Sequence, residues 1–247
     1  MSQPASPPRW DYDPAADLER SVAERLQGFP REPHMWVFAL RALTALGVRA
    51  WLRVYHRFTV VGREHLPQEG SCVLVANHSS HLDAVSLMAA LPLARLHRTF
   101  PAAAADYFFC NLPRSFFAAV CMNALPFDRQ VNGAESLAVC RRLLDGDGNA
   151  LVLFPEGTRC ADGRLGRFRS GIGRLVVGSP TPVVPCYLEG AFAAWPKGRA
   201  LPRPGRLTLR VGPPRSFEGL ANTPEAVQSI CAQLRADVAA LGGEEFA

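Results

Sequence analysis

After residue 58, short apolar runs alternate with segments of helical periodicity, and this alternation restricts the fold more than any other feature of the chain. Runs such as CVLVAN (72–77) and ALVLFP (150–155) are almost continuously apolar, which is typical of strands buried on two faces. Strands are predicted at 59–62, 72–77, 124–128, 150–155, 182–188 and 206–212. Helices are predicted at about 81–91, 113–121, 133–144, 171–178 and 224–241, the last with Thr223 as its N-cap and Pro224 at its first position. The pattern predicts one α/β domain over residues 59–247, with a mixed, mostly parallel sheet flanked by helices.

Two segments precede this domain. Residues 1–33 form an N-terminal extension that begins with a stretch rich in Pro, Ser and Ala, followed by a short polar helix at about 17–27. Residues 34–58 are apolar apart from cations that fall within an arc of about 160° on a helical wheel, namely Arg41, Arg49, Arg53, His56 and Arg57. The other face carries Trp36, Leu40, Leu43, Leu46 and Val54. This amphipathic helix either lies in a membrane interface, with its arginines near lipid phosphates, or docks on the protein's own core.

Composition narrows the class of protein. The net charge of +5 favours an anionic partner, either nucleic acid, a membrane surface or a phosphorylated substrate, but no nucleic-acid recognition motif accompanies the charge. Seven cysteines without a C-x-x-C pair lie mostly in apolar runs (Cys72, Cys121, Cys186), which predicts buried thiols in a reducing compartment. The N-terminus lacks the pattern of a signal peptide, and no charge-free stretch of eighteen apolar residues predicts a plain membrane span.

The stretch NHSSHLD (77–83) follows a predicted strand and contains a candidate general base. Ser80 and Asp83 fit a helix N-cap with an acid at the third helical position, which leaves His78 unexplained. If a turn separates them, Asp83 accepts from one imidazole nitrogen of His78 and makes the other nitrogen a base for a hydroxyl. A metal site is the rival, because His78, His81 and Asp83 form H-x-x-H-x-D, but further histidines lie scattered and no metal is predicted. No G-x-S-x-G nucleophile is present, so the substrate must supply the attacking hydroxyl.

A second stretch, FPEGTRC (154–160), also follows a predicted strand and suits an anion. Gly157 permits a sharp turn that brings backbone amides near a ligand, and Arg159 offers a fork of donors suited to phosphate. Glu156 can hold Arg159 or accept from a substrate hydroxyl; a structural salt bridge in a turn is the alternative. Further cations lie near other strand or helix ends: Arg129, Arg164, Arg167 and Arg169.

These motifs resemble those of the glycerolipid acyltransferases, the family that includes 1-acyl-glycerol-3-phosphate acyltransferase. NHSSHLD matches its H-x4-D motif, LPFDR its second motif, FPEGTR its third, and VVPCYLEG its fourth, in the family's order across about residues 59–190. Two positions depart from the pattern: Cys160 stands where serine is common, and Arg169 where lysine is frequent.

The resemblance implies transfer of a fatty acyl group from acyl-CoA or acyl carrier protein to a hydroxyl of a lysophospholipid such as 1-acyl-glycerol 3-phosphate, with no cofactor or metal. It implies His78 as base and Asp83 as its partner. The groups implied to bind the acceptor are Arg129, Glu156, Gly157, Thr158 and Arg159, with Arg167 and Arg169 as further anion contacts. An acyl-thioester hydrolase and a non-catalytic lipid-binding protein remain alternatives, and the acceptor, donor and chain length stay open.

The arginine edge and the wide apolar face of the helix at 34–58 also predict a place in the cell. A peripheral protein on the cytoplasmic face of a bacterial inner membrane is expected, with membrane phospholipid or lysophospholipid and the acyl donor as partners, and no nucleic acid. The helix at 34–58 and the aromatic run at 106–120 are expected to face the bilayer, although about half of the run's residues fit a protein core.

Overall fold

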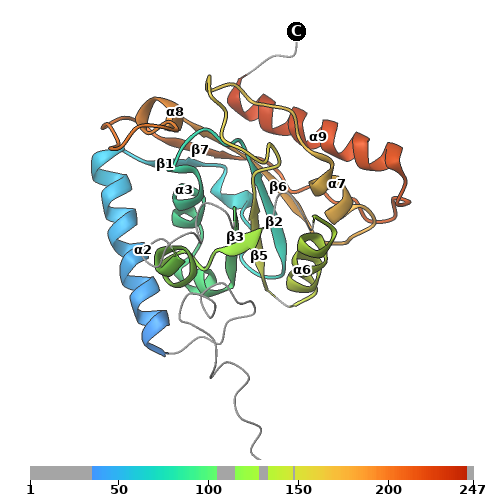
Figure 1. Cartoon of the computed structure of the whole chain (residues 1–247), viewed down its shortest axis with the longest axis horizontal. Coiled ribbons are helices and arrows are strands. Elements are labelled where there is room, and N and C mark those ends of the chain that lie inside the picture. The colour runs from blue at the N-terminus through green and yellow to red at the C-terminus, as the bar shows by residue number, and fades with distance from the viewer. Residues whose placement is uncertain (1–34, 105–114, 128–132, 147, 244–247) are drawn as a thin grey trace, which may run out of the picture.

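The computed structural model describes residues 35–104, 115–127, 133–146 and 148–243, which form a seven-stranded sheet with helices on both faces (Figure 1). The strands are β1 (Thr59–Val61), β2 (Cys72–Ala76), β3 (Thr99–Ala104), β4 (Leu125–Phe127), β5 (Ala150–Leu153), β6 (Val183–Glu189) and β7 (Thr208–Val211). Their order is β1-β7-β6-β2-β5-β3-β4, and all neighbours are parallel except the antiparallel pair β6–β7. The prediction of a mixed, mostly parallel sheet is confirmed.

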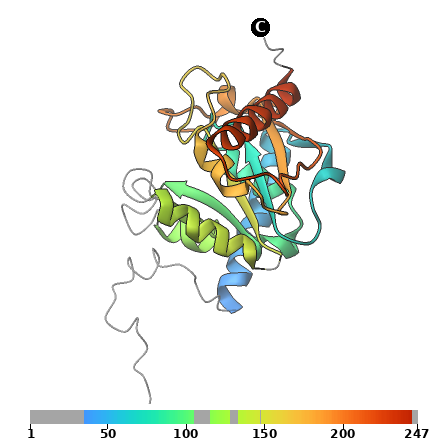
Figure 2. The ribbon, with the colours of Figure 1, turned by 90° about the vertical axis from the view of Figure 1, so that its right-hand side faces the viewer.

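Helices cover the sheet on two sides because β2 is apolar at every position. On one face of the sheet, alternate side chains of β2, such as Leu74, pack with the helices α2 (Met35–Tyr55), α3 (Asp83–Ala90) and α8 (Ala191–Ala194). On the other face, the remaining side chains of β2, such as Val75, pack with α6 (Gly133–Asp145), α7 (Ser170–Val176) and α9 (Pro224–Gly242). Figure 2 looks onto this second layer of helices. Short turns of other helix types complete the described chain: η1 (Arg63–His65), η2 (Leu93–Arg98) and the π-helical η3 (Phe117–Cys121).

Most predicted elements are found within a few residues of their expected bounds. The predicted cap of α9 is confirmed, since Thr223 Oγ1 accepts a hydrogen bond from Ala226 N at 3.2 Å. Cys72 and Cys186 are buried free thiols, as predicted, whereas Cys121 is half-buried. The helix predicted at 17–27 lies outside the described residues.

Strand β3, whose sequence is TFPAAA, was not among the predicted strands. Proline lacks an amide donor and alanine has little preference for strands, so the segment has no local strand signal. It forms a strand because its residues pair in parallel with β5, Phe100 opposite Leu151 and Pro101 opposite Val152. Pairing with a neighbouring strand, and not local sequence preference, makes this segment a strand.

Helix α2 combines the two placements that the sequence left open. It docks through one side, where Leu52 is buried in the core and Val48 packs against that core. Much of its predicted apolar face points outward, with exposed fractions of 57% for Trp36, 67% for Leu43 and 82% for Val54. By length and composition, α2 could cross a membrane, and no other helix in the described part of the chain meets this criterion.

Arg41 corrects the prediction that all cations of α2 form one outward edge. It is buried, and its guanidinium donates to Val120 O at 2.9 Å and to Asn123 Oδ1 at 3.2 Å. This arginine therefore fastens α2 to the segment around η3 instead of facing lipid. Arg53 is exposed near the C-terminal end of the helix and Arg57 just after it, whereas His56, another cation of the predicted edge, is fully buried.

The aromatic run at 106–120 is described only from residue 115 onward. Within that part, Phe116 and Phe117 are exposed, while Ala118, Ala119 and Val120 are buried beside α2. The two exposed phenylalanines lie at the start of η3, which packs against α2.

Candidate active site

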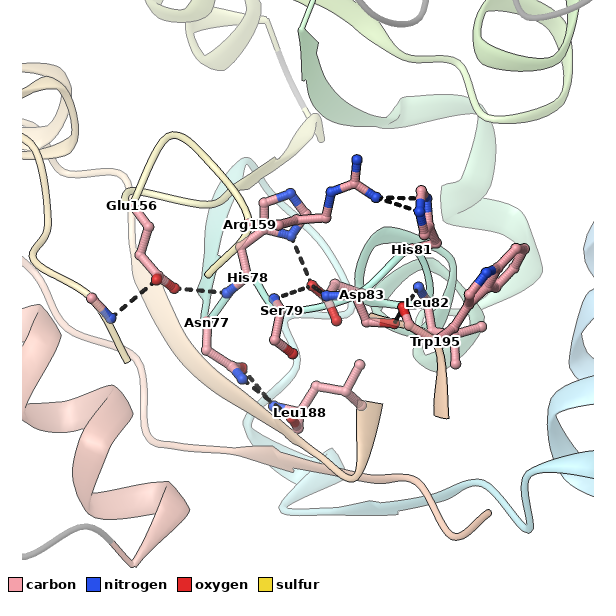
Figure 3. A network of polar contacts seen from close by, with 12 residues as sticks. Asn77, His78, Ser79, His81, Leu82, Asp83, Glu156, Arg159, Leu188 and Trp195 are labelled. Carbon is pink, nitrogen blue, oxygen red and sulfur yellow. Dashed lines mark hydrogen bonds and ion pairs between the residues drawn. The ribbon is translucent and has the colours of Figure 1, made fainter. Parts of the chain in front are cut away.

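Two neighbouring parallel strands bring the two sequence motifs together. β2 and β5 pair with Val75 opposite Leu153, so the residues after each strand leave the sheet at the same edge. Asn77, the first residue after β2, is fixed to β6: its Nδ2 donates to Leu188 O at 3.2 Å and its Oδ1 accepts from Leu188 N at 2.8 Å (Figure 3). The loop that carries His78 therefore starts from a rigid point.

His78 and Asp83 form the expected pair. His78 Nδ1 lies 2.7 Å from Asp83 Oδ2, and Asp83 is fully buried. The same carboxylate oxygen accepts from Ser79 N at 2.7 Å and Ser80 N at 2.8 Å, so one oxygen holds both the turn and the ring (Figure 3). The imidazole stacks on Phe154 with the ring centroids 4.2 Å apart. With Nδ1 engaged by Asp83, Nε2 is the nitrogen available to a substrate hydroxyl.

The predicted N-cap by Ser80 is wrong. Helix α3 begins at Asp83, and its cap position is Leu82 with no side-chain cap. Ser80 Oγ instead accepts from Leu82 N at 3.1 Å and donates to Trp195 O at 2.7 Å. Asp83 holds the turn by accepting from the Ser79 and Ser80 amides, which is the half of a capping box that the acid makes, while the half expected of the Ser80 hydroxyl is missing.

Glu156 is buried, and backbone amides occupy both of its carboxylate oxygens. Oε1 accepts from His78 N at 2.7 Å and Oε2 accepts from Gly166 N at 3.0 Å. Burial raises the pKa of this carboxyl, and the two backbone hydrogen bonds oppose the rise. This arrangement fits a positioning role for Glu156 more closely than contact with substrate.

Gly157 makes the sharp turn that the sequence suggested. Its φ is +74°, and a Cβ there would lie 2.7 Å from Arg169 Nε, which donates to Glu156 O at 3.2 Å. Cys160 N donates to His78 O at 2.9 Å and ties the same loop to the first motif. Of the other residues predicted to bind the acceptor, Thr158, Arg167 and Arg169 are exposed, and Arg129 lies outside the described residues.

Arg159 reaches the first motif through His81. Its Nη1 lies 2.6 Å from His81 Nδ1 and 2.7 Å from His81 Nε2 (Figure 3). His81 also packs against Trp195, with ring centroids 5.0 Å apart. Burial lowers the pKa of His81, and the charge of Arg159 lowers it further.

His81 therefore faces a cation instead of converging with His78 and Asp83 as the H-x-x-H-x-D pattern would require. Within the described ranges, no group of three or more His, Cys, Asp or Glu side chains could hold a metal ion.

Three residues that contribute to the site were not predicted from the sequence. Phe154 stacks on His78, Gly166 binds Glu156, and Trp195 supports His81. Gly166 and Trp195 belong to segments outside the motif strings, and their roles arise from contacts across the fold. Phe154 lies inside the FPEGTRC stretch, but the sequence does not indicate which ring a phenylalanine stacks on.

Comparisons with known proteins agree on one family. A family model described as Acyltransferase matches residues 57–189. The mouse 1-acyl-sn-glycerol-3-phosphate acyltransferase alpha is 31% identical over 183 residues, which cover 72% of this chain and 61% of the mouse protein. The 1-acyl-sn-glycerol-3-phosphate acyltransferase of Limnanthes alba is 28% identical over 155 residues, covering 63% of this chain and 53% of the plant protein. The chain thus spans between about half and three fifths of the length of these relatives.

A solved structure shares the fold. The crystal structure of the 1-acyl-sn-glycerophosphate (LPA) acyltransferase PlsC from Thermotoga maritima superimposes with a TM-score of 0.65 at 21% sequence identity. The superposition covers 86% of this chain and 82% of the other.

The contact between Gly166 and Glu156 gives a stability prediction. In Gly166→Ala the added Cβ would lie 2.8 Å from Glu156 Oε2, and the carboxylate cannot move without weakening its bond to His78 N. We expect a loss of about 1–3 kcal/mol in the free energy of unfolding, measured by urea denaturation. Gly171→Ala is the matched control, because nothing lies within 4 Å of its Cβ and it sits in α7, where alanine should be neutral or stabilising. Equal stability of Gly166→Ala and the unaltered protein would contradict the tight contact.

Proposed function

The chain belongs to the acyltransferase family, and from that premise we propose that it transfers a fatty acyl group from acyl-CoA or acyl carrier protein to the free hydroxyl of a lysophospholipid such as 1-acyl-glycerol 3-phosphate. The observation that carries the proposal is the His78–Asp83 pair with Arg159 of the FPEGTR loop at the same sheet edge. The relatives described above are named for this activity, which supports the choice of acceptor class. We assign the acyltransferase domain to residues 59–247, preceded by a membrane-associated helix at 34–58 and an extension at 1–33.

In the proposed reaction, His78 acts as the general base. Its Nε2 takes the proton of the acceptor hydroxyl while the hydroxyl oxygen attacks the thioester carbonyl carbon. The carbon–sulfur bond then breaks, and the departing thiolate takes up a proton from the imidazolium. Asp83 keeps Nδ1 protonated, orients the ring and stabilises the imidazolium that forms in between. The buried position of Asp83 and its two additional amide donors support this role.

In the same proposal, Arg159 binds the acceptor's phosphate. A guanidinium presents a planar fork of donors that matches phosphate oxygens. Gly157 and Thr158 place the loop beside it, and Arg129, Arg167 and Arg169 remain candidate further contacts. We assign Glu156 to positioning, because its oxygens are engaged by the His78 and Gly166 amides.

We further propose peripheral attachment to an anionic leaflet, at the cytoplasmic face of the membrane. A groove of about 600 Å³ beside α2 is lined by Arg49, Arg53, Arg57 and Arg63, and its lining, as far as the chain is described, contains no carboxylate. Burial lowers the pKa of Arg49, and the charge of Arg63 lowers it further, so these cations repel one another. Helix α2 carries both the exposed apolar face and two of the arginines that line the groove. This arrangement suits a lipid whose tails contact the apolar face and whose phosphate binds the arginines.

The base assignment predicts the effect of two substitutions. His78→Ala should abolish acyl transfer, because no other group would accept the hydroxyl proton. Asp83→Asn should lower kcat by roughly 10²–10⁴-fold, since the amide no longer fixes the tautomer. Transfer is measured with a labelled acyl donor, and circular dichroism checks that both variants fold. Near-normal turnover by folded His78→Ala would refute the mechanism, and thioester loss without acceptor would point to a hydrolase.

The acceptor assignment predicts a selective change in KM. Arg159→Lys keeps the positive charge but loses the planar fork, so the KM for a phosphorylated acceptor should rise by roughly tenfold while the donor KM stays the same. Arg142→Gln, on an exposed position of α6, serves as the control and should change neither constant. A rise in the donor KM alone would show that Arg159 serves the donor instead.

The groove predicts a specific loss of membrane binding. The double variant Arg53→Gln/Arg63→Gln should weaken binding to vesicles containing phosphatidylglycerol by roughly thirtyfold, at about 1 kcal/mol for each cation near an anionic surface. Vesicle sedimentation measures the affinity, and added salt should reduce it in the unaltered protein. The control Arg142→Gln/Arg174→Gln removes the same charge from exposed positions on α6 and α7, across the sheet from α2, and should bind almost normally. Equal losses in the two double variants would mean that net charge, and not the groove, attracts the protein.

A further inference from the structure

We infer that His81 is a positioning residue for the acceptor site: it seats Arg159 while its imidazole is neutral and releases Arg159 when the ring takes up a proton. Affinity for a phosphorylated acceptor should therefore fall on acidification through His81, separately from any titration of the proposed base. This inference rests on the proposed role of Arg159 in binding the acceptor's phosphate.

The charge of Arg159 favours a neutral ring at this contact. Arg159 Nη1 lies 2.6 Å from Nδ1 and 2.7 Å from Nε2 of His81, so the cation is close to both ring nitrogens. A guanidinium carries donors and no acceptor, so the imidazole must offer a lone pair. The imidazolium has none, and protonation would bring two like charges into direct contact.

The neighbours of His81 restrict the movement of its side chain away from Arg159. Its backbone N donates to Trp195 O at 3.3 Å, and Ser80 Oγ donates to the same oxygen at 2.7 Å. The indole of Trp195 covers the ring at 5.0 Å and is itself held by a bond from Nε1 to Arg199 O at 2.9 Å. The ring therefore lies between Trp195 and Arg159, and repulsion would displace the longer and more flexible arginine side chain.

The charged groups around His81 set the direction of its titration. Burial and Arg159 lower its pKa, His78 lowers it slightly further, and Asp83 raises it. Trp195, which packs against the ring, is uncharged. Because the net direction is downward from the ordinary value, the ring is neutral near pH 7 and takes up its proton only in more acidic solution. Acceptor binding should therefore be intact at neutral pH and be lost as the pH falls.

A comparison of binding profiles tests this inference without the acyl donor. Calorimetry would measure the Kd of a short-chain, monomeric 1-acyl-glycerol 3-phosphate from pH 8 to pH 5.5 with the full chain. Wild-type affinity should fall more steeply towards the acid end of this range than that of His81→Gln, by up to about tenfold for each pH unit below the point at which His81 takes up its proton. His81→Gln keeps an oxygen that accepts from Arg159 but does not titrate, so its neutral-pH affinity should be nearly normal. The phosphate's own ionisation affects the two proteins equally and cancels in the comparison.

A control and a second measurement exclude a merely structural effect. His65→Gln, which replaces a histidine bonded to Val211 O in another part of the fold, should keep the wild-type profile. In an NMR titration of the imidazoles, Arg159→Gln should raise the pKa of His81, because the neighbouring cation is removed.

Three results would overturn the inference: identical pH profiles in wild type and His81→Gln, an unchanged His81 pKa in Arg159→Gln, or wild-type affinity that rises on acidification. The last would mean that protonated His81 binds the phosphate itself. A protein that binds the acceptor in this pH-dependent way but fails to transfer acyl groups would refute the proposed reaction and leave the inference standing.

Discussion

The buried carboxylate of Glu156 is the interaction on which the candidate site depends. It accepts from the amides of His78 and Gly166, and the backbone carbonyl of the same residue accepts from Arg169 Nε. The loop after β2 and the stretch from Gly166 to Arg169 thus meet at this one residue. An unpaired buried amide is costly, so each of these segments is held where the carboxylate can reach it. The orientation of the His78 ring toward Asp83 follows from this constraint, because the backbone of His78 is fixed on both sides, by Glu156 at its N and by Cys160 at its O.

A continuous set of contacts joins helix α2 to Arg159, the arginine proposed to bind the acceptor. At the C-terminal end of α2, Tyr55 Oη donates to Pro202 O at 3.2 Å, and the neighbouring Arg203 N donates to Ala194 O at 2.9 Å. Ala194 precedes Trp195, which supports His81 and through it Arg159. The helix with the exposed apolar face is therefore packed onto the same frame that positions the polar site. A lipid acceptor held at a membrane surface and an arginine that binds its phosphate would be placed relative to each other by this frame.

Much of the candidate site could be predicted because its key residues are close in sequence or follow buried strands. His78 and Asp83 are five residues apart, and a turn suffices to join them. The strands before the His78 and Glu156 loops are apolar at every position, which identifies them as buried strands of a mostly parallel sheet, whose ends are expected at one edge. The role of Ser80, by contrast, was mispredicted, since its hydroxyl is drawn to the carbonyl of Trp195 and the local capping pattern carries no trace of that partner.

The sequence by itself determined the α/β layering, the two motifs and the pair of His78 and Asp83, because hydrophobic period and short-range spacing are written locally in the chain. Only the tertiary structure decided that Arg41 turns inward, that TFPAAA becomes a strand, that Glu156 holds the His78 backbone, and that Arg159 rests on His81. Each of these depends on partners between about 50 and 80 residues away in the chain. A local pattern cannot specify such contacts, since they form only when the sheet brings separate segments to one edge or one face.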